Sequence, residues 1–224
     1  MDTDTKALCS WSGGKDSCLA LHLAWESGLR PGRLISMFEE EADRNRSHAV
    51  PRRLLEAQAD AMGLELVTPR AGWPTYEATF IQALQEARQA GFQHAIFGDI
   101  DLVAHREWEE KVCSASDIVP HLPLWDWPRE QVVAAIFSME IQAVCVCVNT
   151  SFLPKEFCGR SYDRQFVADL PAGVDACGEN GEFHTFVTWA PRFRHPLDVH
   201  IKALQFYRGP PEYGAQAFWF AELA

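Results

Sequence analysis

The sequence predicts an α/β fold, with a Rossmann-like parallel sheet in the first half and a smaller α+β part in the second. Short apolar runs alternate with helical patterns four times before residue 140, which is typical of strands joined by crossover helices. Three of the helical patterns stop at a glycine, namely Gly28, Gly63 and Gly91. After Pro120 the alternation ends and β-prone runs follow one another.

The first half contains four expected strand–helix units in chain order. Their strands are placed at residues 7–11, 34–38, 64–67 and 94–99, and their helices at 16–27, 51–62, 75–90 and 104–115. The second half contains an expected helix at 130–139 and strands at 143–148, 183–189, 199–207 and 217–223, with a turn at 209–214. We therefore divide the chain into domains at residues 1–125 and 126–224.

Composition narrows the class of protein. A net charge of -11 opposes nucleic-acid binding, because affinity for the phosphate backbone comes from clustered Lys and Arg. No apolar run approaches the roughly 18 residues of a membrane span, and the start of the chain is acidic and unlike a secretory signal, so we expect a cytoplasmic protein without a membrane segment. Seven cysteines without a C-x-x-C pair predict neither a disulfide framework nor a zinc site, and we expect no protein metal ligands.

The strongest local motif is Ser12-Gly13-Gly14-Lys15-Asp16-Ser17, where the first expected strand meets the first helix. Adjacent glycines allow a tight turn, the helix N-terminus attracts anions, and Lys15 adds a full charge. A plain Gly turn is the alternative, but the hydroxyls, Lys and Asp around the glycines favour a phosphate site. A Walker A loop is excluded because Cys9 stands six positions before Lys15 and Asp16 follows it.

A second motif runs from Cys177 to Thr185, with the sequence Cys-Gly-Glu-Asn-Gly-Glu-Phe-His-Thr. If this segment is extended from Glu182 onward, Glu182 and His184 point to the same face of the strand. An acidic surface hairpin is the alternative interpretation. Arg106 and Glu109 lie three positions apart on a predicted helix, where a surface ion pair competes with a site role.

Together these motifs resemble known enzymes. The segment Ser12–Ser17 matches the S-G-G-x-D-S loop of the PP-loop ATP pyrophosphatases, and Gly178–Thr185 resembles the G-E-x-G-E-F-H-T signature of the diphthine–ammonia ligase family. Further matches are Glu56-x-Gln58-Ala59, Gly98-Asp99-Ile100 followed by Arg106, Glu109 and Cys113, and Pro123-Leu124-Trp125. The resemblance covers nearly the whole chain and implies a HUP-type nucleotide-binding domain.

The resemblance implies an ATP-dependent ligase that adenylates a carboxylate, releases pyrophosphate and amidates the acyl group with ammonia, using ATP and Mg2+. It assigns catalysis to Lys15, Asp16, Glu179, Glu182 and His184, and acceptor binding to Arg106, Glu109, Asn180 and Thr185. The ATP site would comprise Ser12, Gly13, Gly14, Lys15, Asp16, Ser17, Ser36, Met37, Gly98 and Asp99. Which of Glu179, Glu182 and His184 acts as base stays open.

The acceptor and the partners remain open. In the family the acceptor is diphthine on translation elongation factor 2, which implies that protein as substrate, whereas a bacterial source would imply another carboxylate or small metabolite. A non-catalytic adenine-nucleotide-binding protein is the alternative outside enzymes. Sulfur transfer to tRNA is disfavoured by the missing C-x-x-C pair and the negative charge. The apolar segment 217–220 is compatible with a core or with a homo-oligomer interface.

Overall fold

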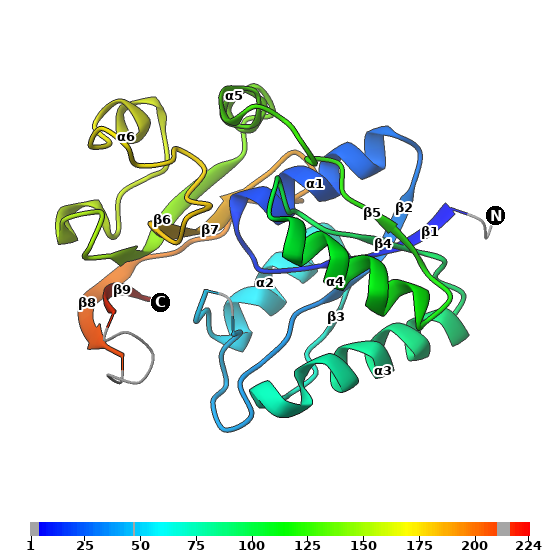
Figure 1. Cartoon of the computed structure of the whole chain (residues 1–224). Coiled ribbons are helices and arrows are strands. Elements are labelled where there is room, and N and C mark those ends of the chain that lie inside the picture. Colours follow the sequence, from blue (N-terminus) through cyan, green and yellow to red (C-terminus); the bar gives the residue numbers. More distant parts are fainter. Residues whose placement is uncertain (1–4, 47, 210–215) are drawn as a thin grey trace. The chain divides into compact units, whose positions relative to one another are not determined.

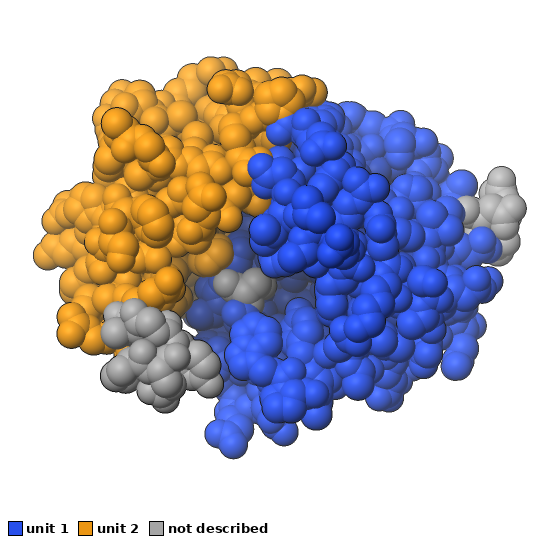
Figure 2. All heavy atoms as spheres, in the orientation of Figure 1, with its two compact units in different colours: residues 1–127 blue, residues 128–224 orange. Residues whose placement is uncertain are grey.

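The computed structural model describes residues 5–46, 48–209 and 216–224. The chain forms two compact units, Met1–Trp127 and Pro128–Ala224, which Figure 2 shows in different colours. In these three described ranges no helix is long and apolar enough to cross a membrane. The expected turn at 209–214 lies outside the described residues, apart from Gly209.

Unit 1 is built on a parallel five-stranded sheet in the order β3-β2-β1-β4-β5 (Figure 1). Strands and helices alternate along the chain, which confirms the predicted Rossmann-like class. The elements are β1 (Lys6–Ser10), α1 (Lys15–Glu26), β2 (Arg30–Ile35), α2 (Arg52–Met62), β3 (Glu65–Val67), a 3-10 turn (Trp73–Thr75), α3 (Tyr76–Gln89), β4 (His94–Ile96), α4 (Val103–Ser114) and β5 (Val119–His121).

The order of the strands reverses between β1 and β4. The chain moves outward from β1 to β2 and β3, and then returns to place β4 on the other side of β1. Right-handed crossovers therefore put α1 and α2 on one face of the sheet and α3 and α4 on the other. On the latter face Phe80, Leu84 and Val112 pack with Leu8 and Ala95 in one core cluster. Ligands of such sheets bind at the carboxyl ends of the strands beside the reversal.

Three strands differ from the prediction. Strand β4 ends at Ile96, whereas the sequence placed this strand at 94–99. Strand β2 ends at Ile35, so Ser36 and Met37 lie just after it, whereas the sequence placed the strand at 34–38. Strand β5 was not predicted, because Pro120 stands in its middle. The strand tolerates proline because it lies at the edge of the sheet and pairs only with β4.

Unit 2 contains an antiparallel four-stranded sheet in the order β7-β6-β9-β8. Its elements are α5 (Arg129–Ser138), β6 (Gln142–Asn149), a 3-10 turn (Lys155–Phe157), α6 (Arg164–Ala168), β7 (Phe183–Trp189), β8 (Ile201–Arg208) and β9 (Ala217–Leu223). The predicted α+β character is confirmed. Helix α6, which the sequence analysis missed, has only five residues, and the Asp163 side chain caps it by accepting a hydrogen bond from Phe166 N at 2.7 Å.

Gly98, just after β4, lies against the first turn of α1. A Cβ atom at this position would come within 2.8 Å of Ser17 N and 2.9 Å of Ser17 Cα. These are backbone atoms at a helix N-terminus, so a side chain cannot be accommodated by rotating a neighbour. Glycine at position 98 therefore permits the end of β4 and the start of α1 to approach each other.

We predict that Gly98→Ala lowers the free energy of unfolding by about 1–3 kcal/mol, because the methyl group must push β4 and α1 apart. Gly32→Ala in β2 is the control, since a Cβ there would make only an ordinary van der Waals contact with the Phe92 ring, at 3.4 Å. Urea denaturation of both variants measures the effect. Equal stability of Gly98→Ala and the wild type would contradict the close approach.

Candidate active site

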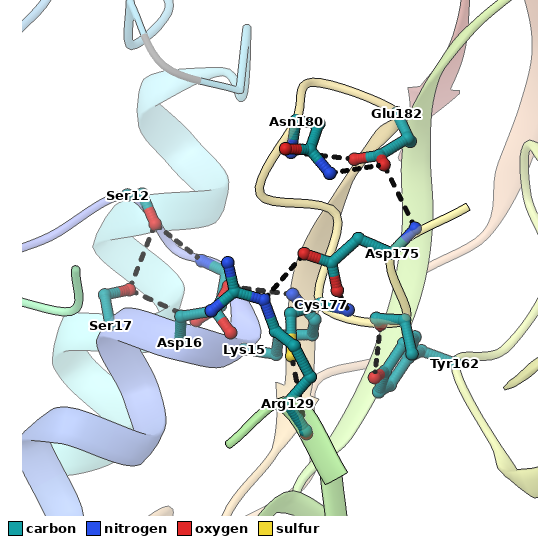
Figure 3. Close-up of polar contacts among 12 residues, drawn as sticks. Ser12, Lys15, Asp16, Ser17, Arg129, Tyr162, Asp175, Cys177, Asn180 and Glu182 are labelled. Carbon is teal, nitrogen blue, oxygen red and sulfur yellow. Dashed lines mark hydrogen bonds and ion pairs between the residues drawn. The ribbon is translucent and has the colours of Figure 1, made fainter. Parts of the chain in front are cut away.

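The candidate residues of unit 1 are centred on the loop between β1 and α1. Gly13 has a φ of 85°, a conformation that favours glycine, and Gly14 caps α1 in an extended conformation. Ser12 Oγ accepts a hydrogen bond from Gly14 N at 3.2 Å and lies 3.0 Å from Ser17 Oγ, which donates to Gly14 O (Figure 3). The predicted motif thus forms a compact turn at a helix N-terminus, the geometry that binds phosphate.

Two fully buried side-chain amides donate hydrogen bonds to backbone carbonyl groups of this loop. Asn45 Nδ2 donates to Ser12 O at 2.8 Å, and Gln58 Nε2 donates to Gly13 O at 3.0 Å. Gln58 is fixed in turn by Trp11, whose Nε1 donates to Gln58 Oε1 at 2.8 Å. No sequence motif pointed to Asn45. Gln58 was noticed as a family match, and the structure supplies its physical role.

Lys15 and Asp16 form an ion pair inside the loop. Lys15 Nζ lies 2.8 Å from Asp16 Oδ2, and the lysine is buried. Burial raises the pKa of Asp16, although the neighbouring lysine partly offsets this effect. The other oxygen, Asp16 Oδ1, is buried and has no hydrogen-bond partner among the described residues. A buried acceptor without a partner is suited to a ligand.

The ends of β2 and β4 supply further polar groups. Ser36 Oγ is buried after β2 and has no hydrogen-bond partner in the described part of the chain. Nearby in sequence, Arg46 binds Met37 O through its backbone N–H and Ala71 O through Nη2, while its buried Nε has no partner within the described ranges. Arg46 was not predicted, because a lone arginine after an acidic loop carries no motif.

Asp99, just after β4, is the centre of a small acidic network. Asp99 Oδ1 lies 2.7 Å from His105 Nδ1, and the carboxylate is also hydrogen-bonded to Glu109 of α4. Burial and the hydrogen bond to Asp99 raise the pKa of Glu109 to about 10. Burial opposes ionisation of Asp99 as well, but the hydrogen bonds from His105 and Glu109 keep its pKa below the usual value. Glu109 is therefore a neutral acid that donates to the Asp99 carboxylate.

Arg106 does not join this network. Its Nε donates to Glu110 Oε1 at 2.7 Å, and its guanidinium stacks over the Trp125 ring at 4.9 Å. The considered ion pair between Arg106 and Glu109 is wrong, because Glu109 turns into the protein interior and Glu110, four positions on, takes the arginine. Arg106 and Glu109 lie on one helix but in different environments.

A separate group of candidate residues lies in unit 2, in the loop from Asp175 to Glu182. The buried Glu182 carboxylate accepts hydrogen bonds from Asp175 N at 3.0 Å, Asn180 N at 2.9 Å and Asn180 Nδ2 at 3.0 Å (Figure 3). Gly178 has a φ of 76°, and a Cβ there would lie 2.8 Å from Phe183 O. Both oxygens of Glu182 thus serve the folding of the loop.

Side chains outside the motif fix the base of the same loop. Arg129 Nε lies 2.7 Å from Asp175 Oδ2, and Asp175 Oδ1 accepts from Cys177 N at 2.8 Å. Tyr162 donates its hydroxyl to Ala176 O at 2.8 Å. Sequence reasoning missed Arg129 and Asp175, because their ion pair joins segments 46 residues apart.

The remaining predicted residues of the second motif differ in exposure. Strand β7 begins at Phe183, so Glu182 precedes the strand in which His184 lies. Thr185 is buried, His184 and Glu179 are half-buried, and Asn180 is exposed. Within residues 5–46, 48–209 and 216–224, no group of three or more His, Cys, Asp or Glu side chains is arranged to hold a metal ion.

The family models and the curated relatives point to one family. Residues 5–119 match the diphthamide synthase N-terminal domain, and residues 129–220 match the diphthamide synthase C-terminal domain. The diphthine–ammonia ligases of Homo sapiens and Bos taurus are 26% and 27% identical to this chain, and each match covers 84% of this chain and 80% of the relative. A solved structure from Methanocaldococcus jannaschii, described as a predicted subunit of tRNA methyltransferase, is 16% identical with a TM-score of 0.43; it covers 62% of this chain and 77% of that chain.

We predict that Glu109→Gln changes how stability depends on pH. The unfolded chain releases the Glu109 proton above about 4.5, whereas the folded protein keeps it up to about 10, so the wild type loses stability as pH rises through this window. Glutamine keeps a hydrogen-bond donor for Asp99 but has no proton to lose. The variant should therefore gain stability relative to the wild type between about pH 6 and about pH 9 in urea denaturation.

Glu107→Gln is the control, because Glu107 is exposed on the same helix. Its stability should run parallel to that of the wild type at every pH. If Glu109→Gln also ran parallel to the wild type, Glu109 would not be a buried neutral acid.

Proposed function

The chain belongs to the diphthamide synthase family, whose curated relatives are ligases, and we propose that it is an ATP-dependent ligase that makes an amide from a carboxylate and ammonia. The proposed reaction has two steps. The acceptor carboxylate displaces pyrophosphate from ATP to form an acyl adenylate, and ammonia then displaces AMP from the acyl carbon. The observation that carries the proposal is the glycine–lysine loop at the reversal of the parallel sheet, between β1 and α1.

In the first step the loop would hold the phosphates of ATP. The glycine backbone at positions 13 and 14 and the N-terminus of α1 favour an anion, and Lys15 would stabilise the charge that develops on departing pyrophosphate. Ser36 and Arg46 fit the same ligand, because each has a buried polar atom that finds no hydrogen-bond partner in the described ranges. Residues 1–125 would thus form the ATP-binding domain.

Mg2+ is expected with ATP, and the residues beside the loop fit it. Asp16 Oδ1 is a buried carboxylate oxygen without a hydrogen-bond partner among the described residues, which suits a hard cation that also binds phosphate oxygens. When bound, Mg2+ would neutralise phosphate charge. Asp99, whose lowered pKa keeps it ionised, would add negative charge at the same edge of the sheet, where the carboxyl ends of β1 and β4 lie.

Residues 126–224 would handle the acceptor and ammonia in the second step. Glu179 and His184 are half-buried members of the second motif and are our candidates for binding ammonium or removing its proton. Glu182 would act as a positioning residue, because its carboxylate is occupied by three N–H groups of its own loop. Asn180, exposed at the tip of this loop, and Thr185 would contact the acceptor.

We propose diphthine on translation elongation factor 2 as the acceptor. The support is the similarity to two proteins that are named diphthine–ammonia ligase. Another carboxylate is the alternative, since the identity to these relatives is 26–27%. Incubation with ATP, ammonium and diphthine-bearing elongation factor 2 distinguishes the two, because only the former predicts amidation of that protein.

We predict that Lys15→Met lowers the formation of AMP and pyrophosphate by about 100-fold or more, because it removes the charge that acts on the leaving group. Lys111→Met is the control, since Lys111 is an exposed lysine of the same unit that pairs with Glu77. Chromatography of the nucleotides measures both variants. Formation of ADP by the wild type would contradict the proposed reaction, and undiminished AMP formation by Lys15→Met would contradict the assigned site.

A further inference from the structure

Strand β8 is an unusual outer strand. Among the described strands of its sheet it pairs with β9 alone (Figure 1). All eight of its residues are exposed. Four of them are large and apolar: Ile201, Leu204, Phe206 and Tyr207, with exposed fractions of 36–51%. An outer strand with exposed apolar side chains and free backbone groups is a template for pairing with another strand.

One face of β8 also carries positive charge. Leu204, Phe206 and Arg208 alternate along the strand and share a face, and Lys202 lies at its start. Phe206 contacts Trp219 of β9, with ring centroids 5.1 Å apart, and Lys155 Nζ lies 5.8 Å from the Trp219 ring. Among the described residues, Lys155, Lys202 and Arg208 form no ion pair, although the chain carries a net charge of -11.

We propose that β8 is a docking strand for an extended segment of the protein substrate that carries, on one face, two apolar residues between two acidic residues. The segment would add to the sheet as a fifth strand, with its backbone paired to β8, its apolar side chains on Leu204 and Phe206, and its carboxylates facing Lys202 and Arg208. The identity of the partner rests on the proposed function, which requires a protein that carries the acceptor carboxylate. Binding itself does not depend on the reaction.

The charges favour this occupant over two others. If two copies of β8 paired with each other, the charged side chains of the two strands would all be Lys and Arg. Strand β8 contains no acidic residue that could pair with them. A nucleic acid would meet three cations on a protein whose net charge repels a long polyanion. A segment with acidic and apolar side chains would form ion pairs with these cations and would cover the exposed apolar side chains.

The first test uses direct binding. The probes are fluorescein-labelled octapeptides with the sequence Glu-Thr-Val-Thr-Val-Thr-Glu-Thr or with lysine in place of both glutamates, and an oligouridylate of similar length. We expect the wild type to bind the acidic peptide in preference to both other probes. The double variant Lys202→Glu/Arg208→Glu should weaken that binding by about tenfold or more, whereas Arg192→Glu/Arg194→Glu, which makes the same charge change outside β8, should not.

A second variant separates the apolar contact from the charges. Leu204→Thr/Phe206→Thr keeps β-prone side chains, so the strand should persist, but it removes the exposed apolar groups. We expect it also to weaken binding of the acidic peptide, with circular dichroism unchanged. Equal binding by the wild type and both β8 variants, preference for the oligouridylate, or a wild-type dimer in light scattering that the β8 variants dissociate would each overturn the proposal.

The third test uses the complete reaction with diphthine-bearing elongation factor 2. If that protein docks on β8, the β8 variants should raise its KM by about tenfold while leaving kcat and the KM for ATP unchanged. A β8-dependent peptide site without any amidation of this protein would refute the proposed acceptor and leave the docking strand established. Amidation with an unchanged KM in both variants would refute the docking strand and leave the proposed function standing.

Discussion

The candidate ATP site depends on one close approach, between Gly98 at the end of β4 and the first turn of α1. The reversal of strand order makes β4 the neighbour of β1, so the loop after β4 must pass the helix that follows β1. Only a hydrogen atom fits there, since a Cβ would lie 2.8 Å from Ser17 N. The same approach brings Asp99 near Asp16, where the Asp99 charge adds to burial in raising the pKa of Asp16. The electrostatics of the site follow from this packing.

The structure also explains how a chain with a net charge of -11 can accommodate an anion. Around the loop, Asp16 is paired with Lys15, and Glu109 is held as a neutral acid by burial and by Asp99. Of the three carboxyl groups, only Asp99 stays ionised without a lysine or arginine partner among the described residues. In unit 2, the Glu182 charge is spread over three N–H donors. The net charge counted from the sequence therefore overstates the negative charge near the candidate site.

Patterns among residues that are close in sequence predicted the features that depend on neighbouring residues. The strand–helix alternation of unit 1, the phosphate loop and the strands of unit 2 follow from periodicity, glycine positions and short motifs. The roles of Asn45, Gln58 and Arg129 did not, because each acts on a loop 33 to 46 residues away. Strand β5 was hidden by Pro120, which only an edge position tolerates. Glu109 was selected from the sequence, but its neutral state depends on burial and on Asp99, which no motif encodes.

Formation of an acyl adenylate is the central claim, and oxygen transfer tests it most directly. The acceptor carboxylate is labelled with oxygen-18 and incubated with the protein, ATP and ammonium, and the nucleotide products are analysed by mass spectrometry. We predict that one labelled oxygen appears in AMP, because the carboxylate oxygen that attacks the α-phosphate leaves with it. Label in inorganic phosphate together with ADP would show an acyl phosphate instead. Amide formation with unlabelled AMP would contradict the account altogether.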